Sequence, residues 1–239
     1  KTKAPWDDAV TLALTYAEIP YEVIYDTEIM EDELVLYDWL HLHHEDFTGQ
    51  YGKFWNAYKS QAWYQNQVKE LESIAGKYGF DKVSQLKLAI GKRVQAFVAG
   101  GGFMFAMCSA TDSYDIALAA EGTDICNHMY DGDGPSPNAQ GELDFTNTLA
   151  FENFSLRMSP YEYEYSNIDA NFGRKVAKNL DYFTLFDFSA KWDPIPTMLT
   201  QNHTKTVKGF MGQTTAFKKD FIKSDVLILG ENKTANEAK

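Results

Sequence analysis

One stretch constrains the fold of this chain more than any other. It is a short apolar run that ends in a cysteine and is followed directly by a helical pattern. Residues 103–107 have the length and composition of a buried strand. Thr111 or Asp112 is a suitable helix N-cap, so residues 114–120 are predicted to form a helix. Cys108 therefore falls in a sharp turn between a strand and a helix.

Small residues flank Cys108 where such a turn brings strand and helix backbones together: Ala106 before it and Ala110 after it. The helix N-terminus would favour the thiolate and so lower the pKa of the Cys108 thiol. Backbone N–H groups of the turn, around Met107, Ser109 and Ala110, could hold a developing oxyanion. The pattern predicts a nucleophile elbow with a strained backbone at the cysteine; the ordinary alternative is a buried structural thiol.

A second strand-like run, residues 37–42, ends in a polar loop of His43, His44, Glu45 and Asp46. The connection to the next strand is long enough for helices, so the two strands should be parallel. Parallel strands end at one edge of a sheet, where ligands bind in open α/β folds. We therefore expect this loop beside the cysteine and lining the pocket, with one of its side chains in direct or water-mediated contact with the sulfur. His43 is the first choice for that contact and Glu45 the second, and His43 is the expected base.

Other readings of the polar residues are weaker. His128, twenty residues after the cysteine, is a possible substitute base or pocket residue, although an ordinary loop histidine would look the same. The loop at 43–46 could offer metal ligands, but adjacent residues seldom reach one ion and no second ligand cluster is evident. Residues 131–134 suggest a calcium loop, yet Ser136 stands where that loop needs glycine. No metal and no cofactor are predicted.

Alternating helical and strand-like patterns predict an α/β chain. A mainly parallel sheet with helices on both faces is expected, followed by an antiparallel β elaboration over about residues 121–224 within a single domain, 1–239. The period-two aromatic run at 161–165 is typical of an edge strand, although a carbohydrate- or partner-binding face has the same pattern. The expected helices are 7–18, 57–78 and 81–98, and the further expected strands are 21–26, 151–157, 184–188, 194–201, 206–211 and a buried parallel strand at 226–230.

Composition narrows the class of protein. The 239 residues are 44% hydrophobic and 15% aromatic, enough for a sizeable core. The net charge of −12 argues against nucleic acid as a partner. Apolar runs are too short for a membrane span. Two cysteines are not a disulfide framework and favour a reducing compartment, although removal of a signal segment would leave an extracytoplasmic location open.

The elbow and the histidine loop together resemble the class I glutamine amidotransferase-like superfamily, and more closely a group of bacterial proteins often labelled asparagine synthetase B. The resemblance implies a flavodoxin-like fold and thiol chemistry on an amide. The elbow departs from the superfamily's Gly-x-Cys-x-Gly in having alanine at both flanks. In the superfamily the catalytic histidine follows the last core strand, and no histidine follows Val226 here. We therefore expect further strands beyond both ends, with that histidine beyond Lys239, or else a degenerate triad.

Two hypotheses of different classes follow. In the first, the chain is a cysteine-dependent amidotransferase or hydrolase that acts on a small amide substrate. In the second, it is a binding or assembly component that kept the fold and lost its base. An incomplete sheet would also favour a homo-oligomer or an additional chain segment that completes it.

Overall fold

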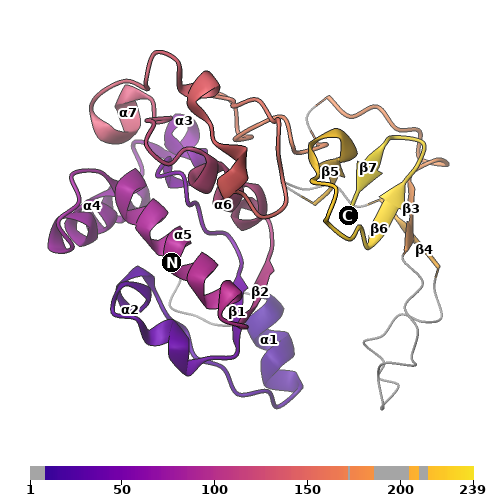
Figure 1. Ribbon diagram of the computed structural model, residues 1–239, viewed down its shortest axis with the longest axis horizontal. Helices are drawn as coiled ribbons and strands as arrows, with labels where there is room; N and C mark the ends of the chain where they lie inside the picture. The colour runs from indigo at the N-terminus through magenta and orange to yellow at the C-terminus, as the bar shows by residue number, and fades with distance from the viewer. Residues whose placement is uncertain (1–8, 172, 186–204, 210–214) are drawn as a thin grey trace.

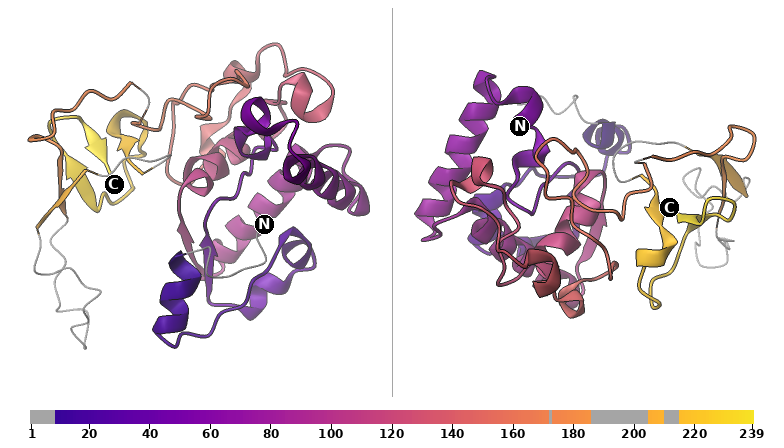
Figure 2. Two further views of the ribbon diagram at one scale, coloured as in Figure 1. Left: turned by 180° about the vertical axis from the view of Figure 1, so that it is seen from behind. Right: turned by 90° about the horizontal axis from the view of Figure 1, so that it is seen from above.

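The computed structural model describes residues 9–171, 173–185, 205–209 and 215–239. It is a mixed α/β structure in which a helical body lies beside a small antiparallel sheet, and this arrangement is visible from three directions (Figures 1 and 2). The α-helices are α1 (Ala9–Tyr16), α2 (Asp26–Met30), α3 (Trp55–Tyr58), α4 (Ala62–Lys77), α5 (Val83–Ala99), α6 (Ser109–Ala119) and α7 (His128–Asp131). Short 3-10 helices are η2 (Glu33–Leu36), η3 (Tyr51–Lys53), η4 (Ala139–Glu142), η5 (Phe145–Asn147) and η7 (Lys219–Phe221).

The strands form two separate sheets. In the first, β1 (Trp39–Leu42) pairs in parallel with β2 (Phe103–Ala106), with Leu40 opposite Met104. The second has the order β4-β3-β6-β7-β5, and all its pairings are antiparallel. Its strands are β3 (Tyr182–Leu185), β4 (Thr206–Lys208), β5 (Phe217–Lys218), β6 (Gly230–Asn232) and β7 (Glu237–Ala238).

Helices α5 and α6 form the centre of the body. In α5, Leu86, Ile90 and Val94 are fully buried at the spacing of one helix face. Tyr114 of α6 packs edge-to-face on Phe47 and donates a hydrogen bond from its hydroxyl to the Gly91 carbonyl at 3.0 Å. The main core thus joins both helices to the inner face of β1.

A second core ties α6 to the C-terminal part of the chain. Ile116, on the far side of α6, belongs to a buried cluster with Phe154 and Ile168. Phe217 at the start of the C-terminal hairpin packs against the same cluster. The elaboration after α6 therefore shares its core with the helix that follows the cysteine.

The parallel sheet is smaller than expected, and a mainly parallel sheet is not observed. One face of β1 and β2 packs on the helices, with Leu40 and Leu42 buried. The other face, which was expected to carry helices too, leaves Trp39, Phe103 and Phe105 substantially exposed, Phe103 by 60%. Among the residues placed in the structure, helices therefore cover only one face of the parallel sheet formed by β1 and β2.

Two predicted strands are wrong. Residues 21–25 are irregular and lead into α2, because the Glu28 carboxylate accepts the Tyr25 N–H at 2.8 Å and caps that helix. At 226–230 no buried parallel strand forms: Leu227 is 63% exposed, and β6 begins only at Gly230, antiparallel to its neighbours. The expectation that these two strands share one parallel sheet is therefore wrong.

Other boundaries differ by less. The helix expected over 57–78 is split, because Gln61 has an extended backbone and caps a new helix, α4. The run at 151–157 makes only isolated bridges through Phe151 and Leu156, and the run at 161–165 forms no strand. The strand expected at 194–201 lies outside the described residues. An antiparallel sheet after the elbow is confirmed, although its strands β6 and β7 lie beyond the expected limit at about residue 224.

None of the helices described is both long enough and apolar enough to cross a membrane.

Candidate functional site

Strands β1 and β2 end together, and this shared end defines the candidate site. The backbone N–H of Met107 donates to the Leu42 carbonyl at 2.9 Å, one step beyond the last paired residues. Because neighbouring strands lie about 4.8 Å apart, the residues that follow this bond start from adjacent points. The loop that begins at His43 and the turn at Cys108 thus start from the same edge of the parallel sheet, as the sequence predicts.

The backbone at Cys108 has the strained conformation expected of an elbow. Its φ of 54° and ψ of −137° lie in a region that residues with a side chain rarely adopt. Cys108 itself is the N-cap of α6, and the Thr111 N–H bonds back to its carbonyl at 3.1 Å. The helix thus begins at Ser109, earlier than the expected cap at Thr111 or Asp112, because the turn is tighter than a separate capping residue allows.

Small side chains make this tight turn possible. Ala110 is completely buried, and Ser109 is nearly so. The Ala110 N–H donates to the Met107 carbonyl at 3.2 Å. Since the Met107 N–H is also bonded within the sheet, two of the three N–H groups expected to hold an oxyanion are already used. The third of these groups is the backbone N–H of Ser109, whose hydrogen bonding lowers the pKa of the Cys108 thiol.

The electrostatic setting of the thiol differs from the expectation. Burial raises the pKa of the half-buried Cys108 thiol, and the charges of Asp112 and Asp169 raise it further. Hydrogen bonds from Ser109 lower the pKa but do not offset burial. The net shift is therefore opposite to the lowering expected from the helix N-terminus, because burial is the largest effect on the thiol and the charges of Asp112 and Asp169 add to it.

Asp112 is the most perturbed of these acids. It is fully buried in the first turns of α6, and burial, followed by the charge of Asp169, raises its pKa to about 8. Asp169 is also buried, and its carboxylate accepts the Asn171 N–H at 2.7 Å. Sequence spacing could not reveal this pair, since 57 positions separate the two residues.

The loop at 43–46 is held mainly by its own carboxylates. Glu45 accepts the backbone N–H of His43 at 2.6 Å, and the rings of His43 and His44 stack with centroids 3.8 Å apart. Asp46 accepts the Thr48 N–H and the Gly52 N–H, both at 2.7 Å. Asp46 therefore shapes the loop and acts as a structural residue, whereas His43 stays half-buried at the strand end.

The remaining histidines are distributed around the molecule. In β1, His41 stacks on Phe105 with centroids 5.3 Å apart, on the same face as His43. His128 is exposed at the start of α7 and hydrogen-bonds Asn127 at 2.7 Å through its ring. Figure 1 shows α7 and β2 in different parts of the helical body. His203 lies outside the described residues.

Tyr163 is an aromatic side chain close enough to Cys108 to interact with it electrostatically. Tyr163 is partly exposed and stacks on Phe54 with centroids 6.0 Å apart. Its pKa is raised by burial and by the nearby Cys108. Tyr161 is exposed and contacts Trp55, whereas Tyr165 is buried.

Lys53 is a functional candidate that sequence reasoning missed. Its ammonium group is buried and donates to the carbonyls of Arg157 and Glu164 at 2.7 and 2.8 Å. Burial lowers the pKa of Lys53 to about 8. In the sequence, Gly52 is the nearby residue that could have indicated an unusual backbone here. Tyr51, Gly52 and Lys53 all have positive φ and form one left-handed turn.

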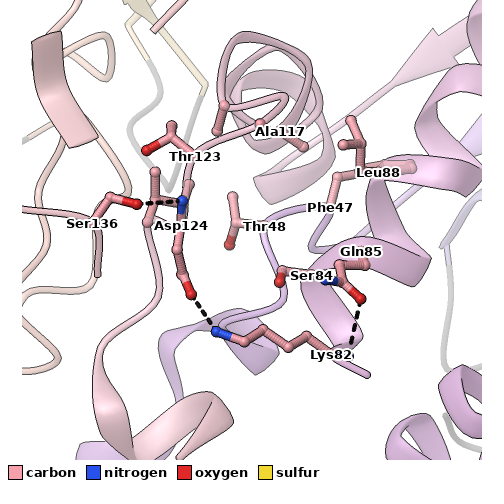
Figure 3. Close-up of a pocket in the computed structure, with 13 residues that line it drawn as sticks. Phe47, Thr48, Lys82, Ser84, Gln85, Leu88, Ala117, Thr123, Asp124 and Ser136 are labelled. Atoms are coloured by element: carbon pink, nitrogen blue, oxygen red, sulfur yellow. Dashed lines mark hydrogen bonds and ion pairs between the residues drawn. The ribbon is translucent and has the colours of Figure 1, made fainter. Parts of the chain in front are cut away.

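A cavity of about 360 Å³ lies elsewhere, between the start of α5, the end of α6 and the loop that follows α6 (Figure 3). Lys82, Ser84 and Asp124 contribute to its polar lining. Neither Cys108 nor any residue of the loop at 43–46 belongs to its wall.

Comparison with protein-family models, with curated proteins and with solved structures finds no match to this chain.

Proposed function

We propose that this protein is a cysteine-dependent amidohydrolase or amidotransferase of the class I glutamine amidotransferase-like type, acting on a small amide. The observation that supports the proposal is the strained backbone of Cys108, which has a φ of 54° in the turn between β2 and α6. This turn follows the edge of the parallel sheet at which the loop that starts with His43 also begins. Strain at one non-glycine residue, placed between strand and helix, is typical of a nucleophile elbow.

The proposed reaction follows the order of thiol acyl transfer. The Cys108 sulfur attacks the amide carbonyl as its proton passes to a base, and the carbonyl oxygen becomes an oxyanion near the Ser109 N–H. The C–N bond then breaks, the amine takes the proton from the base, and a thioester remains on Cys108. Water then attacks the thioester, the carboxylic acid leaves, and a proton returned to the sulfur regenerates the thiol; in an amidotransferase the ammonia released in the earlier step passes to an acceptor.

A base is essential in this scheme, because the resting thiol has a raised pKa. His43 is the proposed base, as its backbone is anchored by Glu45 at the sheet edge. Tyr163 and Phe54 would form an aromatic wall for the substrate next to the sulfur. The flavodoxin-like part of the proposal requires further parallel strands beside β1 and β2, supplied by a second copy or by additional chain.

A reactive glutamine analogue tests the proposal directly. Incubation of the full chain with 6-diazo-5-oxo-L-norleucine should add one adduct on Cys108, located by peptide mass spectrometry, and ammonia should be released from L-glutamine. Cys108→Ala should abolish both results, and His43→Asn should slow them at least tenfold. Cys126→Ser is the matched control and should leave them unchanged. An adduct absent from Cys108, together with ammonia release equal in wild type and Cys108→Ala, would contradict the proposal.

The second candidate is a binding component without catalysis, and the raised pKa of Cys108 is the observation that favours it. Two buried acids close to a sulfur oppose thiolate formation. This candidate predicts that the analogue labels neither cysteine faster than it labels the same chain after unfolding.

A further inference from the structure

We propose that Asp124, Cys126 and Asp131 form a binding site for a divalent transition metal of the zinc type. One ligand atom from each of these residues lies within 4.8 Å of the other two. In a tetrahedral zinc site, bonds of about 2.0–2.3 Å place the ligand atoms roughly 3.3–3.8 Å apart. Small side-chain rotations would therefore close the set around an ion. This site is independent of the function proposed for Cys108.

The fold holds the three ligands in place through the backbone. Asp124 accepts the Cys126 N–H at 2.7 Å, and the Ser136 hydroxyl accepts the Asp124 N–H at 3.1 Å. The Cys126 thiol is 1% exposed and donates to the Thr48 carbonyl at 3.3 Å. The Asp131 side chain is only 6% exposed. These restraints limit the rearrangement that an incoming ion would require.

A positive charge already pairs with two of the three proposed ligands, Asp124 and Asp131. The Lys82 ammonium pairs with Asp124, with Asp131 at 3.1 Å and with Asp133 at 2.5 Å. Three carboxylates around one ammonium leave an excess of negative charge that favours a divalent cation. Lys82 and Asp124 also line the polar cavity of Figure 3, which gives the lysine side chain space to withdraw.

A buried tyrosine supplies an independent indication of a missing ligand. Tyr130 is 3% exposed, and its hydroxyl makes no hydrogen bond to any residue that the structure places. Tyr130 directly precedes the proposed ligand Asp131 in α7. A buried hydroxyl normally has a partner. Water bound to the metal as a fourth ligand would be that partner.

The donor set selects the kind of metal. A thiolate with two carboxylates suits Zn²⁺ or Co²⁺, whereas Mg²⁺ and Ca²⁺ take oxygen ligands. On binding, the Cys126 S–H bond breaks, its proton goes to solvent, and a metal–sulfur bond forms. The Lys82 ammonium keeps its protons and moves away from the carboxylates.

Cobalt is a spectroscopic probe of the proposed metal–thiolate bond. The full chain, without an affinity tag and with reductant removed, is titrated with CoCl₂ while the near-ultraviolet thiolate-to-cobalt charge-transfer band is recorded. We expect a saturable band that ZnCl₂ abolishes. Cys126→Ser should lose the band, and Cys108→Ser, the matched cysteine control, should keep it.

Two further variants test the roles of the acids and of the lysine. Asp131→Asn should weaken cobalt binding at least tenfold, and Lys82→Met should strengthen it severalfold because the competing cation is gone. Far-UV circular dichroism checks that each variant is folded, and if Cys126→Ser is not, the Asp131→Asn and Lys82→Met titrations decide. Absence of the band in the wild type at millimolar cobalt, a band that survives in folded Cys126→Ser, or unchanged binding in Lys82→Met would each overturn the proposal in favour of a purely structural lysine cluster.

Discussion

The Asp115 carboxylate accepts the backbone N–H of Phe151 at 2.8 Å, in the interior of the protein. The same side chain accepts the N–H groups of Leu149 and Ala150 at 2.8 and 2.7 Å. One residue of α6 thus satisfies three consecutive donors of the segment after η5. This contact joins the helix that starts at the cysteine to the second core.

Removal of the Asp115 carboxylate should destabilise the protein strongly. Asp115→Ala leaves three inward-facing N–H groups without their acceptor, and we expect a loss of about 3–5 kcal/mol in the free energy of unfolding. Urea denaturation followed by circular dichroism measures the loss. Asp225→Ala, at an exposed position, is the control and should change stability by less than about 0.5 kcal/mol. A loss below 1 kcal/mol in Asp115→Ala would show that water replaces the carboxylate.

Lys53 should be important for stability although it is charged. Lys53→Met removes the donor from the buried carbonyls of Arg157 and Glu164, so we expect a loss of about 2–4 kcal/mol at pH 7. Lys69→Met on the exposed side of α4 is the matched control. Equal urea midpoints for the two variants would contradict this role of the ammonium group.

Asp112 should make stability fall as pH rises towards 8. Its pKa is about 8 in the folded protein and close to the ordinary value of about 3.9 when unfolded. Between these values the folded state holds a proton that the unfolded state has lost. Its contribution to stability is therefore fully present below pH 4 and declines by up to about 1.4 kcal/mol per pH unit as pH rises.

The Asp112→Asn variant tests this pH dependence. The asparagine does not titrate, so the fall in unfolding free energy between pH 5 and 7 should be shallower than in the wild type. Asp225→Asn, at an exposed position, is the control and should keep the wild-type slope. Identical slopes in wild type and Asp112→Asn would show that Asp112 is not protonated in the folded protein at these pH values.

Alkylation of Cys108 by iodoacetamide should be slow near neutral pH. Because its pKa is raised, the thiol should react more slowly at pH 7.5 than the same cysteine in the urea-unfolded chain. Asp112→Asn removes one of the charges that raise this pKa and should accelerate the reaction, most clearly near pH 9, where Asp112 is ionised. Peptide mass spectrometry separates Cys108 from Cys126. Faster alkylation in the folded chain at pH 7.5 would contradict the prediction.

Two glycines should respond oppositely to alanine. Gly49 has a φ of +81°, and an added Cβ would lie 2.7 Å from the backbone of Ser84, so Gly49→Ala should cost about 2 kcal/mol or more. Gly76, in α4, has no atom within 4 Å of an added Cβ, and Gly76→Ala should stabilise by about 0.5 kcal/mol. Thermal unfolding of both variants checks the signs, and stabilisation by Gly49→Ala would be the contradictory result.

Sequence reasoning succeeded where the signal is local. The helix around Leu86 and Ile90 repeats its apolar residues at helical spacing, and the strand before Cys108 is short, apolar and preceded by glycines. The conformation of Cys108 also follows from local chemistry, because small residues on both sides allow a tight turn. The shared edge of β1 and β2 follows from the parallel rule.

Long-range electrostatic effects and the pairing of strands could not be predicted from the sequence. Asp112 and Asp169 come together only through the packing of α6 against a distant segment, so their effect on the thiol could not be predicted. The apolar run that contains Leu227 looked buried, because periodicity does not say whether a partner strand exists. Lys53 was not identified from the sequence, since nothing nearby shows which carbonyls its ammonium group reaches.

The positive φ of Cys108 lowers the stability of the fold, whereas the proposed reaction needs a thiol at the same position. Glycine there would relieve the strain without disturbing the fold, so Cys108→Gly should raise the unfolding free energy while removing the thiol. In a lineage that had no use for the sulfur, selection for stability would favour glycine at this turn. A cysteine conserved there in divergent descendants would therefore indicate that the thiol is still used, and glycine at this position would indicate that its function has been lost.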